Sequence, residues 1–133
     1  SASIGIAQLE KIDNLQKKRK FIWDQYQHAF LDSDHILCPV EANKNDIHSY
    51  FTYCIRVKNR DKLAKHLLNK NIYTTLRYHP LHMNPIFNQQ NVSLPNCERL
   101  NDEALSIPLH PRLSNDDVDS VINEIKNFVK QND

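Results

Sequence analysis

Glycine is almost absent from this sequence of 133 residues, which contains only Gly5. Backbone that approaches a phosphate group closely usually depends on several glycines, because a side chain would block the approach. The composition therefore excludes a glycine-rich nucleotide loop. We expect the chain to supply part of a ligand site and not all of one.

The sequence also has little net charge and no long apolar run. Its 17 basic and 16 acidic residues leave a net charge of +1, which gives no reason to expect nucleic acid or an anionic membrane as a partner. The basic run at 17–20 falls within a helical pattern and is interpreted as a solvated helix face. Because no segment resembles a transmembrane span or a signal peptide, we expect a cytoplasmic protein.

The residues that could bind a metal or act as a nucleophile do not have the spacing of a known metal site or of a catalytic pair. The cysteines are odd in number and far apart, which indicates reduced thiols and not a disulfide framework: Cys38, Cys54 and Cys97. His79 and His82 have a spacing that metal sites use, but Pro80 separates them and no third ligand has a recognisable spacing. No cysteine or serine pairs with a histidine as a nucleophile would require. We therefore predict no metal site and no catalytic residue on this chain.

Hydrophobic periodicity predicts four main helices and three strands in alternation. Helical spacing predicts one long helix over 4–31, a short helix around 63–68, a helix from Ser93 to Leu105, and a last helix from Ser114 to about Lys130. Alternation predicts strands over 51–58 and 72–76, and a short edge strand at 107–109. We expect an α+β fold of about three strands covered by helices, forming a single domain over residues 1–133.

Three local signals predict where helices begin and end. Ser114 followed by Asp117 is typical of a capping box, which starts a helix. Asn69 and Asn71 both suit the left-handed conformation that often ends a helix. Asn84 before Pro85 resembles an N-cap followed by proline, and predicts a helical turn or two through Phe87.

The most informative segment is RYHPLHMNP at 77–85, directly after a predicted strand. It places an arginine, a tyrosine, two histidines and two prolines within nine residues, which is typical of a ligand-facing loop whose backbone is fixed. Arg77, Tyr78 and His82 could bind a polyhydroxylated, anionic ligand. Two alternatives remain open here, because the loop could equally pack on its own domain. His48, in the polar segment before the first strand, is interpreted as either structural or part of a site.

Several segments, in order and spacing, resemble one known family. They read IGIAQLEKI at 4–12, HSYF at 48–51 with IRV at 55–57, NIYTTLRYHPLH at 71–82, ERL at 98–100, and LSIPLHP at 105–111 with LS at 113–114 and DV at 117–118. The sequence is similar to the C-terminal small domain of the DegT/StrS family of pyridoxal-phosphate-dependent nucleotide-sugar aminotransferases. The resemblance runs through nearly all of the chain.

The resemblance implies a fold-type-I enzyme that moves an amino group, usually from glutamate, onto a keto sugar carried on a nucleoside diphosphate. It implies a homodimer and a large domain that binds pyridoxal phosphate through a lysine Schiff base. Carried over by position, it places Tyr78 and His82 near the nucleotide sugar, with Arg77 beside them. His48 and Ser49 would lie near the junction of the two domains.

The parts that hold the cofactor in this family lie outside the matched region. The resemblance therefore implies that the chain alone binds no cofactor and is inactive, because the cofactor supplies the electron sink for transamination. The predicted first helix would be about 40 Å long, so we expect one end to project toward another domain or subunit. Two alternatives are a free-standing, non-catalytic module that binds a nucleotide sugar or a protein, and a structural dimerisation domain. The dimerisation alternative rests on the aromatic residues Phe21, Trp23 and Tyr26 in the first helix.

Overall fold

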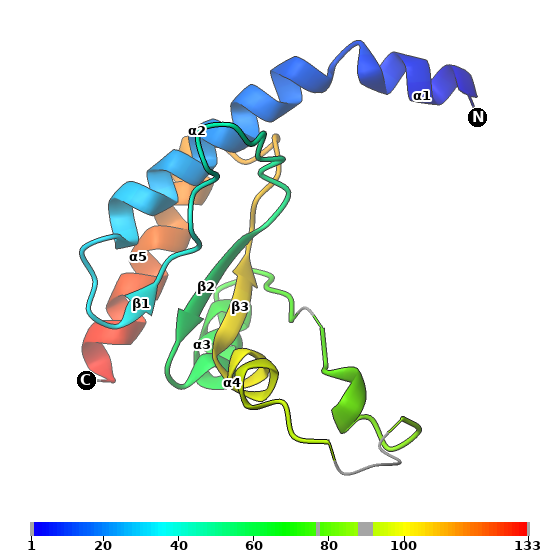
Figure 1. Ribbon diagram of the computed structural model, residues 1–133. Coiled ribbons are helices and arrows are strands. Elements are labelled where there is room, and N and C mark those ends of the chain that lie inside the picture. Colours follow the sequence, from blue (N-terminus) through cyan, green and yellow to red (C-terminus); the bar gives the residue numbers. More distant parts are fainter. Residues whose placement is uncertain (1, 77, 88–91, 133) are drawn as a thin grey trace.

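A three-stranded antiparallel sheet with three of the helices packed on one face forms the body of the molecule (Figure 1). The computed structural model describes residues 2–76, 78–87 and 92–132. The sheet order is β1-β2-β3, with β1 at Ile36–Leu37, β2 at Tyr53–Val57 and β3 at Ala104–Ile107. The helices are α1 (Ala2–Leu9), α2 (Ile12–Phe30), α3 (Arg60–Asn69), α4 (Pro95–Glu103) and α5 (Asn115–Gln131), with a 3-10 turn at Leu81–Met83. The expected α+β class with three strands covered by helices is confirmed.

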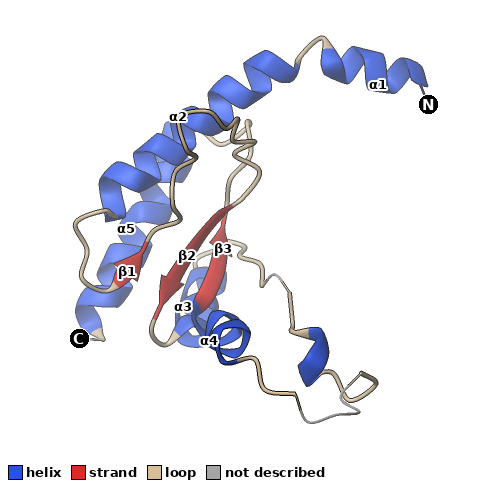
Figure 2. Cartoon of the chain, viewed as in Figure 1, coloured by secondary structure: helices blue, strands red, loops and turns tan. Residues whose placement is uncertain are grey.

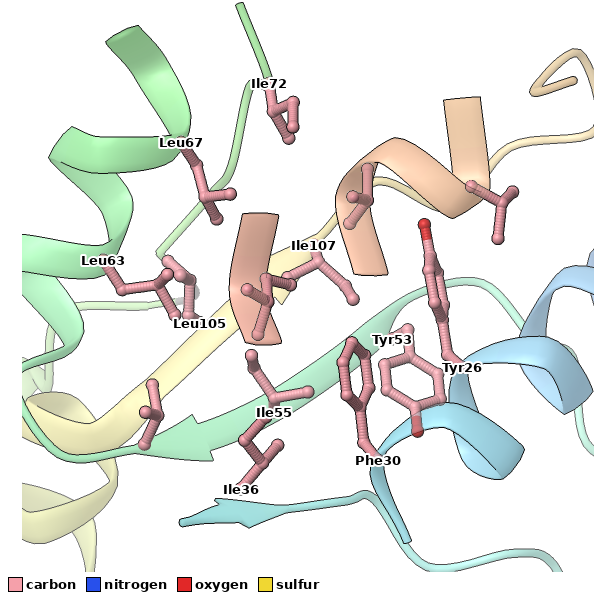
Figure 3. Close-up of a cluster of buried hydrophobic side chains, with 14 of the residues drawn as sticks. Tyr26, Phe30, Ile36, Tyr53, Ile55, Leu63, Leu67, Ile72, Leu105 and Ile107 are labelled. Carbon is pink, nitrogen blue, oxygen red and sulfur yellow. The ribbon is translucent and has the colours of Figure 1, made fainter. Parts of the chain in front are cut away.

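The core lies between the sheet and helices α2, α3 and α5 (Figure 3). In β2 every second residue is buried, so Tyr53, Ile55 and Val57 point toward the helices while Cys54 and Arg56 do not. The helices supply the other side of the core through Ile22, Trp23, Tyr26, Phe30, Leu63, Leu67, Val118, Val121, Ile125 and Phe128. Removing one such aliphatic side chain from water stabilises the fold by about 1.5–3 kcal/mol.

One polar contact inside the core fixes the end of β3 against α2. The Tyr26 hydroxyl donates a hydrogen bond to the carbonyl oxygen of Pro108 at 2.8 Å. Burial raises the pKa of Tyr26, so the hydroxyl keeps its proton and remains a donor. The Tyr26 ring also lies 5.1 Å from that of Tyr53. The residues that follow β3 are therefore held close to the middle of α2.

The single helix predicted over 4–31 is wrong in one respect, since the structure has two helices with a bend between them (Figure 1). At the bend, the Lys11 N–H donates to Gln8 and not to the residue four positions earlier. None of the residues of α1 is buried. Because helices in proteins owe most of their stability to packing, nothing in this part of the chain holds α1 in line with α2.

Two of the predicted strands are also corrected. The segment 72–76 is not a strand of the sheet, since only Thr75 pairs, as a single bridge to Ser106. The strand predicted at 107–109 is instead β3, four residues that begin at Ala104, where the sequence pattern still predicted helix. β1 was not predicted, because two residues are too few to show an alternation. Phe51 was expected on the buried face but is 62% exposed, since β2 begins two residues later.

The predicted helix ends are better reproduced. Ser114 and Asp117 form a complete capping box at the start of α5. Of the two asparagines, Asn71 has φ 60° just after α3, as expected for a left-handed residue that ends a helix, whereas Asn69 is still the last residue of α3. Asn84 accepts a hydrogen bond from the Ile86 N–H at 3.1 Å and opens one turn, not a helix.

Candidate functional site

Residues 78–85 of the segment that the sequence singles out lie in a loop that extends away from the sheet (Figure 2). Tyr78 is 81% exposed, and His79 is exposed beside it. Pro80 has φ −59° and ψ 130°, an extended conformation that precedes the short 3-10 turn. The prediction for Arg77 falls outside the described residues. The Tyr78 hydroxyl is therefore available to a ligand or to another part of a larger protein.

His82 is placed differently from Tyr78, because it is tied to α4. Its Nε2 lies 3.1 Å from Oε1 of Glu98, and its side chain is only 13% exposed. The same oxygen accepts the Leu94 N–H at 2.7 Å. The backbone N–H of Leu94, and then the His82 ring, lower the pKa of Glu98. His82 thus has one ring nitrogen engaged with Glu98, which leaves Nδ1 as the atom that could meet a ligand.

His48 lies in an aromatic corner beside α2. Its Nδ1 accepts the Tyr50 N–H at 2.8 Å, which places the ring proton of the neutral form on Nε2. The His48 ring centroid is 4.6 Å from that of Trp23 and 4.5 Å from that of Tyr50. Tyr50 has φ 47°, a left-handed conformation that is uncommon for a bulky residue. The ring of His48 is therefore held firmly, while the neighbouring Ser49 is exposed.

Glu41 completes this corner and was not predicted from the sequence. Its Oε2 accepts the Trp23 indole N–H at 3.1 Å, and its Oε1 accepts the Tyr50 hydroxyl at 3.1 Å. Burial, followed by this hydrogen bond to Glu41, raises the pKa of Tyr50. The Nζ of Lys20 lies 5.7 Å from the Tyr50 ring centroid. No sequence spacing links Glu41 to Trp23, since the contact depends on how the connection after α2 folds back.

The two groups of predicted residues approach each other along one side of the sheet. Residues 51–52, just after Ser49, and residues 73 and 75, just before the 78–87 segment, line a common cleft of about 160 Å³. A larger cavity of about 390 Å³ lies at the other end of β2, beside Leu37, Val57 and the Arg56–Glu103 ion pair. Neither cavity is lined by a predicted site residue. Only the smaller cleft is lined by residues that neighbour both predicted groups in the sequence, so we assign that cleft to the candidate site.

The described part of the chain shows neither a metal-binding cluster nor a membrane-spanning helix. Across residues 2–76, 78–87 and 92–132, no three histidine, cysteine or acidic side chains gather in a way that could hold a metal ion. None of the helices in those ranges is long and apolar enough to cross a bilayer.

The family is shown by comparison with known proteins. The model of the DegT/DnrJ/EryC1/StrS aminotransferase family matches residues 1–126, and the chain belongs to this family. It is 31% identical over 132 residues to dTDP-4-dehydro-2,3,6-trideoxy-D-glucose 4-aminotransferase of Saccharopolyspora spinosa, covering 98% of this chain and 34% of that protein. It is 30% identical to the spore coat polysaccharide biosynthesis protein SpsC of Bacillus subtilis, covering 97% of this chain and 36% of that protein.

Solved structures agree with the family assignment. The fold is similar to that of the aminotransferase TlmJ from Streptoalloteichus hindustanus, with a TM-score of 0.94 and 34% identity over 99% of this chain and 36% of that one. It is also similar to DesV of S. venezuelae, whose structure is a complex with a ketimine intermediate, with a TM-score of 0.88 and 25% identity over 96% of this chain and 35% of that one. The chain thus spans about a third of the length of the relatives it matches.

Proposed function

We propose that this chain is the small domain of a pyridoxal-phosphate-dependent aminotransferase that transfers an amino group from glutamate to a keto sugar on a nucleoside diphosphate. The observation that carries the proposal is the coverage, because nearly all of this chain matches about a third of each relative. The other part of such an enzyme would supply the large domain. The small domain would contact the substrate, close the site and form part of a homodimer contact.

The residues of this chain do not by themselves fit pyridoxal phosphate. Every lysine is exposed, whereas a lysine that carries this cofactor must meet it within an enclosed site. Gly5 lies on the exposed helix α1, and a Cβ added there would meet nothing within 4 Å, so no close approach requires a glycine at this position and it forms no phosphate cradle. In this proposal the cofactor is held by residues outside 1–133, and the chain alone does not transaminate.

The exposure of certain side chains supports a partner surface. In α1 the side chains of Ile4, Ile6 and Leu9 are 68%, 60% and 66% exposed. Exposed apolar side chains in a row usually mark a surface that another domain or subunit covers. Tyr78 would reach the nucleotide sugar, with Arg77 beside it and His82 oriented by Glu98. His48 and Ser49 would lie where the two domains meet.

An assay of the polypeptide as it occurs in its source, with whatever segments flank residues 1–133, tests the proposal. The assay would supply glutamate and a panel of keto sugars on nucleoside diphosphates, and would measure 2-oxoglutarate formation. We expect activity in the intact polypeptide, an absorbance band of bound cofactor, and neither in residues 1–133 alone. An intact polypeptide without the cofactor band would contradict the proposal. Transamination by residues 1–133 alone would contradict it as well.

A further inference from the structure

Helices α2, α3 and α5 lie on one face of the sheet (Figure 2). A cleft of about 160 Å³ lies beside β3. It is lined by Phe51, Thr52, Tyr73, Thr75 and residues 106–109. None of these lining residues carries a charge, and three of them carry aliphatic hydroxyls. Its chemistry is therefore that of a small, neutral and hydroxyl-rich site.

Strand pairing explains why the hydroxyls gather there. Ser106 pairs directly with Cys54 on one side and with Thr75 on the other. Directly opposed residues of antiparallel segments point to the same face, with Cβ atoms about 5 Å apart. Since Tyr53 and Ile107 point into the core, Ser106 and Thr75 point to the opposite face. Thr52 precedes Cys54 by two residues and shares that face.

These hydroxyls have no partner in the described part of the chain. No side-chain hydrogen bond among the described residues involves Thr52, Thr75 or Ser106. Ser106 is only 5% exposed as a residue, yet it borders the cleft. Its hydroxyl is not one of the fully buried side-chain atoms without a partner among the described residues, so water or a ligand in the cleft can reach it and form the hydrogen bond that it lacks.

The lining suits a sugar ring better than a diphosphate. A hydroxyl both donates and accepts, which matches the hydroxyls of a sugar. The Tyr73 ring is 74% exposed at the edge of the cleft, and an aromatic ring offers an apolar face to the C–H groups of a pyranose. No lysine or arginine lines the cleft, so nothing there would neutralise phosphate charge. Pockets for whole drug-sized ligands usually span roughly 300–1,000 Å³, which exceeds this cleft.

We propose that this cleft binds the hexose ring of the nucleotide sugar, with Thr75 and Ser106 as its hydrogen-bonding residues and Tyr73 as its stacking residue. This inference rests on the function proposed above and assigns one part of the substrate to one part of the chain. The nucleoside diphosphate lies outside the cleft. Thr75 also connects the sugar site to the 78–87 segment. Its backbone pairs with Ser106 at the cleft, and Thr75 lies only two residues before Arg77 in the sequence.

Binding measurements on the intact polypeptide separate the two parts of the substrate. Calorimetric titrations would use UDP-, dTDP- and GDP-linked hexoses, and each free nucleoside diphosphate. We expect Thr75→Val and Ser106→Ala each to weaken binding of the sugar-linked form about fivefold. Binding of the free diphosphate should not change. Thr74→Val is the matched control, because it makes the same chemical change on a neighbouring residue that does not line the cleft.

Each outcome decides the inference. If the intact polypeptide binds and aminates a nucleotide sugar while Thr75→Val and Ser106→Ala bind it normally, the sugar site is wrong and the proposed function stands. Equal weakening of sugar-linked and free diphosphate would also overturn the sugar site. If the unaltered polypeptide binds no nucleotide sugar, both proposals fail. Thr52→Val serves as the second variant should Ser106→Ala lower the melting temperature.

Discussion

The Nε2 atom of His82 lies 3.1 Å from Oε1 of Glu98, so a histidine of the exposed 78–87 segment is anchored to α4. The anchor also includes the Leu94 N–H, which donates to the same oxygen at 2.7 Å. The pKa of Glu98 is held below its ordinary value of 4.5, mainly by Leu94 and then by His82. One carboxylate thus holds two points of the chain that lie 12 residues apart.

This arrangement predicts a pH dependence. A carboxyl group whose pKa is lowered by folding stabilises the folded form above its unfolded pKa, and this stabilisation is lost as the pH falls through its folded value. We expect the 78–87 segment to detach from α4 as the pH falls below about 4.5. Met83 is the only methionine of this chain and lies in the 3-10 turn beside His82, so its methyl NMR signal reports on detachment.

A matched variant checks the assignment to Glu98. Glu98→Gln should place the Met83 signal near its low-pH position at neutral pH and remove the titration. Glu10→Gln, at an exposed acid on the turn after α1, should leave the titration intact. A Met83 signal that titrates equally in Glu98→Gln would show that another group is responsible.

Substitution of Tyr78 tests substrate contact with little effect on the stability of the fold. Its side chain is 81% exposed, so Tyr78→Phe should change the melting temperature by less than about 1 °C. If the hydroxyl contacts the nucleotide sugar, kcat/KM of the intact polypeptide for amination should fall about tenfold. A neutral hydrogen bond contributes about 0.5–1.5 kcal/mol, and a hydrogen bond to a charged group contributes more. Unchanged kinetics in Tyr78→Phe would remove Tyr78 from the site.

The core can be tested with two adjacent leucines of α3. Leu67 is fully buried and Leu68 is 57% exposed, although the sequence pattern placed both on the apolar side of the helix. Leu67→Ala should lower the free energy of unfolding by about 2–5 kcal/mol, because it leaves a cavity. Leu68→Ala should change it by less than about 0.5 kcal/mol. Chemical denaturation gives both values, and equal losses would mean that α3 is rotated from its described orientation.

The backbone after α3 predicts an unusual ranking of substitutions. Asn71 has φ 60°, a conformation that glycine adopts freely and that alanine adopts at a cost. Asn71→Ala should therefore lower the free energy of unfolding by about 1 kcal/mol, whereas Asn71→Gly should be neutral or slightly stabilising. Thermal unfolding would show the order. A reversal of that order would argue against the left-handed conformation.

Long amphipathic helices and local end signals could be predicted from the sequence, because both depend on nearby residues. The apolar spacing of α5 and the pairing of Ser114 with Asp117 are examples, and both are confirmed. Strand pairing could not be predicted in the same way. The segment 72–76 alternates like a strand, but whether it joins a sheet depends on the distant Ser106, which it meets only at Thr75.

The candidate site shows the same division. Tyr78 and His82 are predicted as site residues from the local crowding of functional side chains and from the family resemblance. The roles of Glu98 and Glu41 depend on contacts across 16 and 18 residues of sequence, and a single sequence gives no signal for them. The cleft that includes Thr75 and Ser106 was missed because those residues are 31 positions apart and carry no charge or motif.

The corner around His48 gives the chain a built-in optical reporter. Trp23 is the only tryptophan in the sequence, and its indole contacts Glu41, His48, Tyr50 and Tyr53 at once. The fluorescence of an indole depends on the hydrogen bonds and rings around it. Any ligand or subunit that moves this corner should therefore shift the emission maximum of Trp23. Events at the proposed domain junction can therefore be followed in real time in residues 1–133, without attaching a dye.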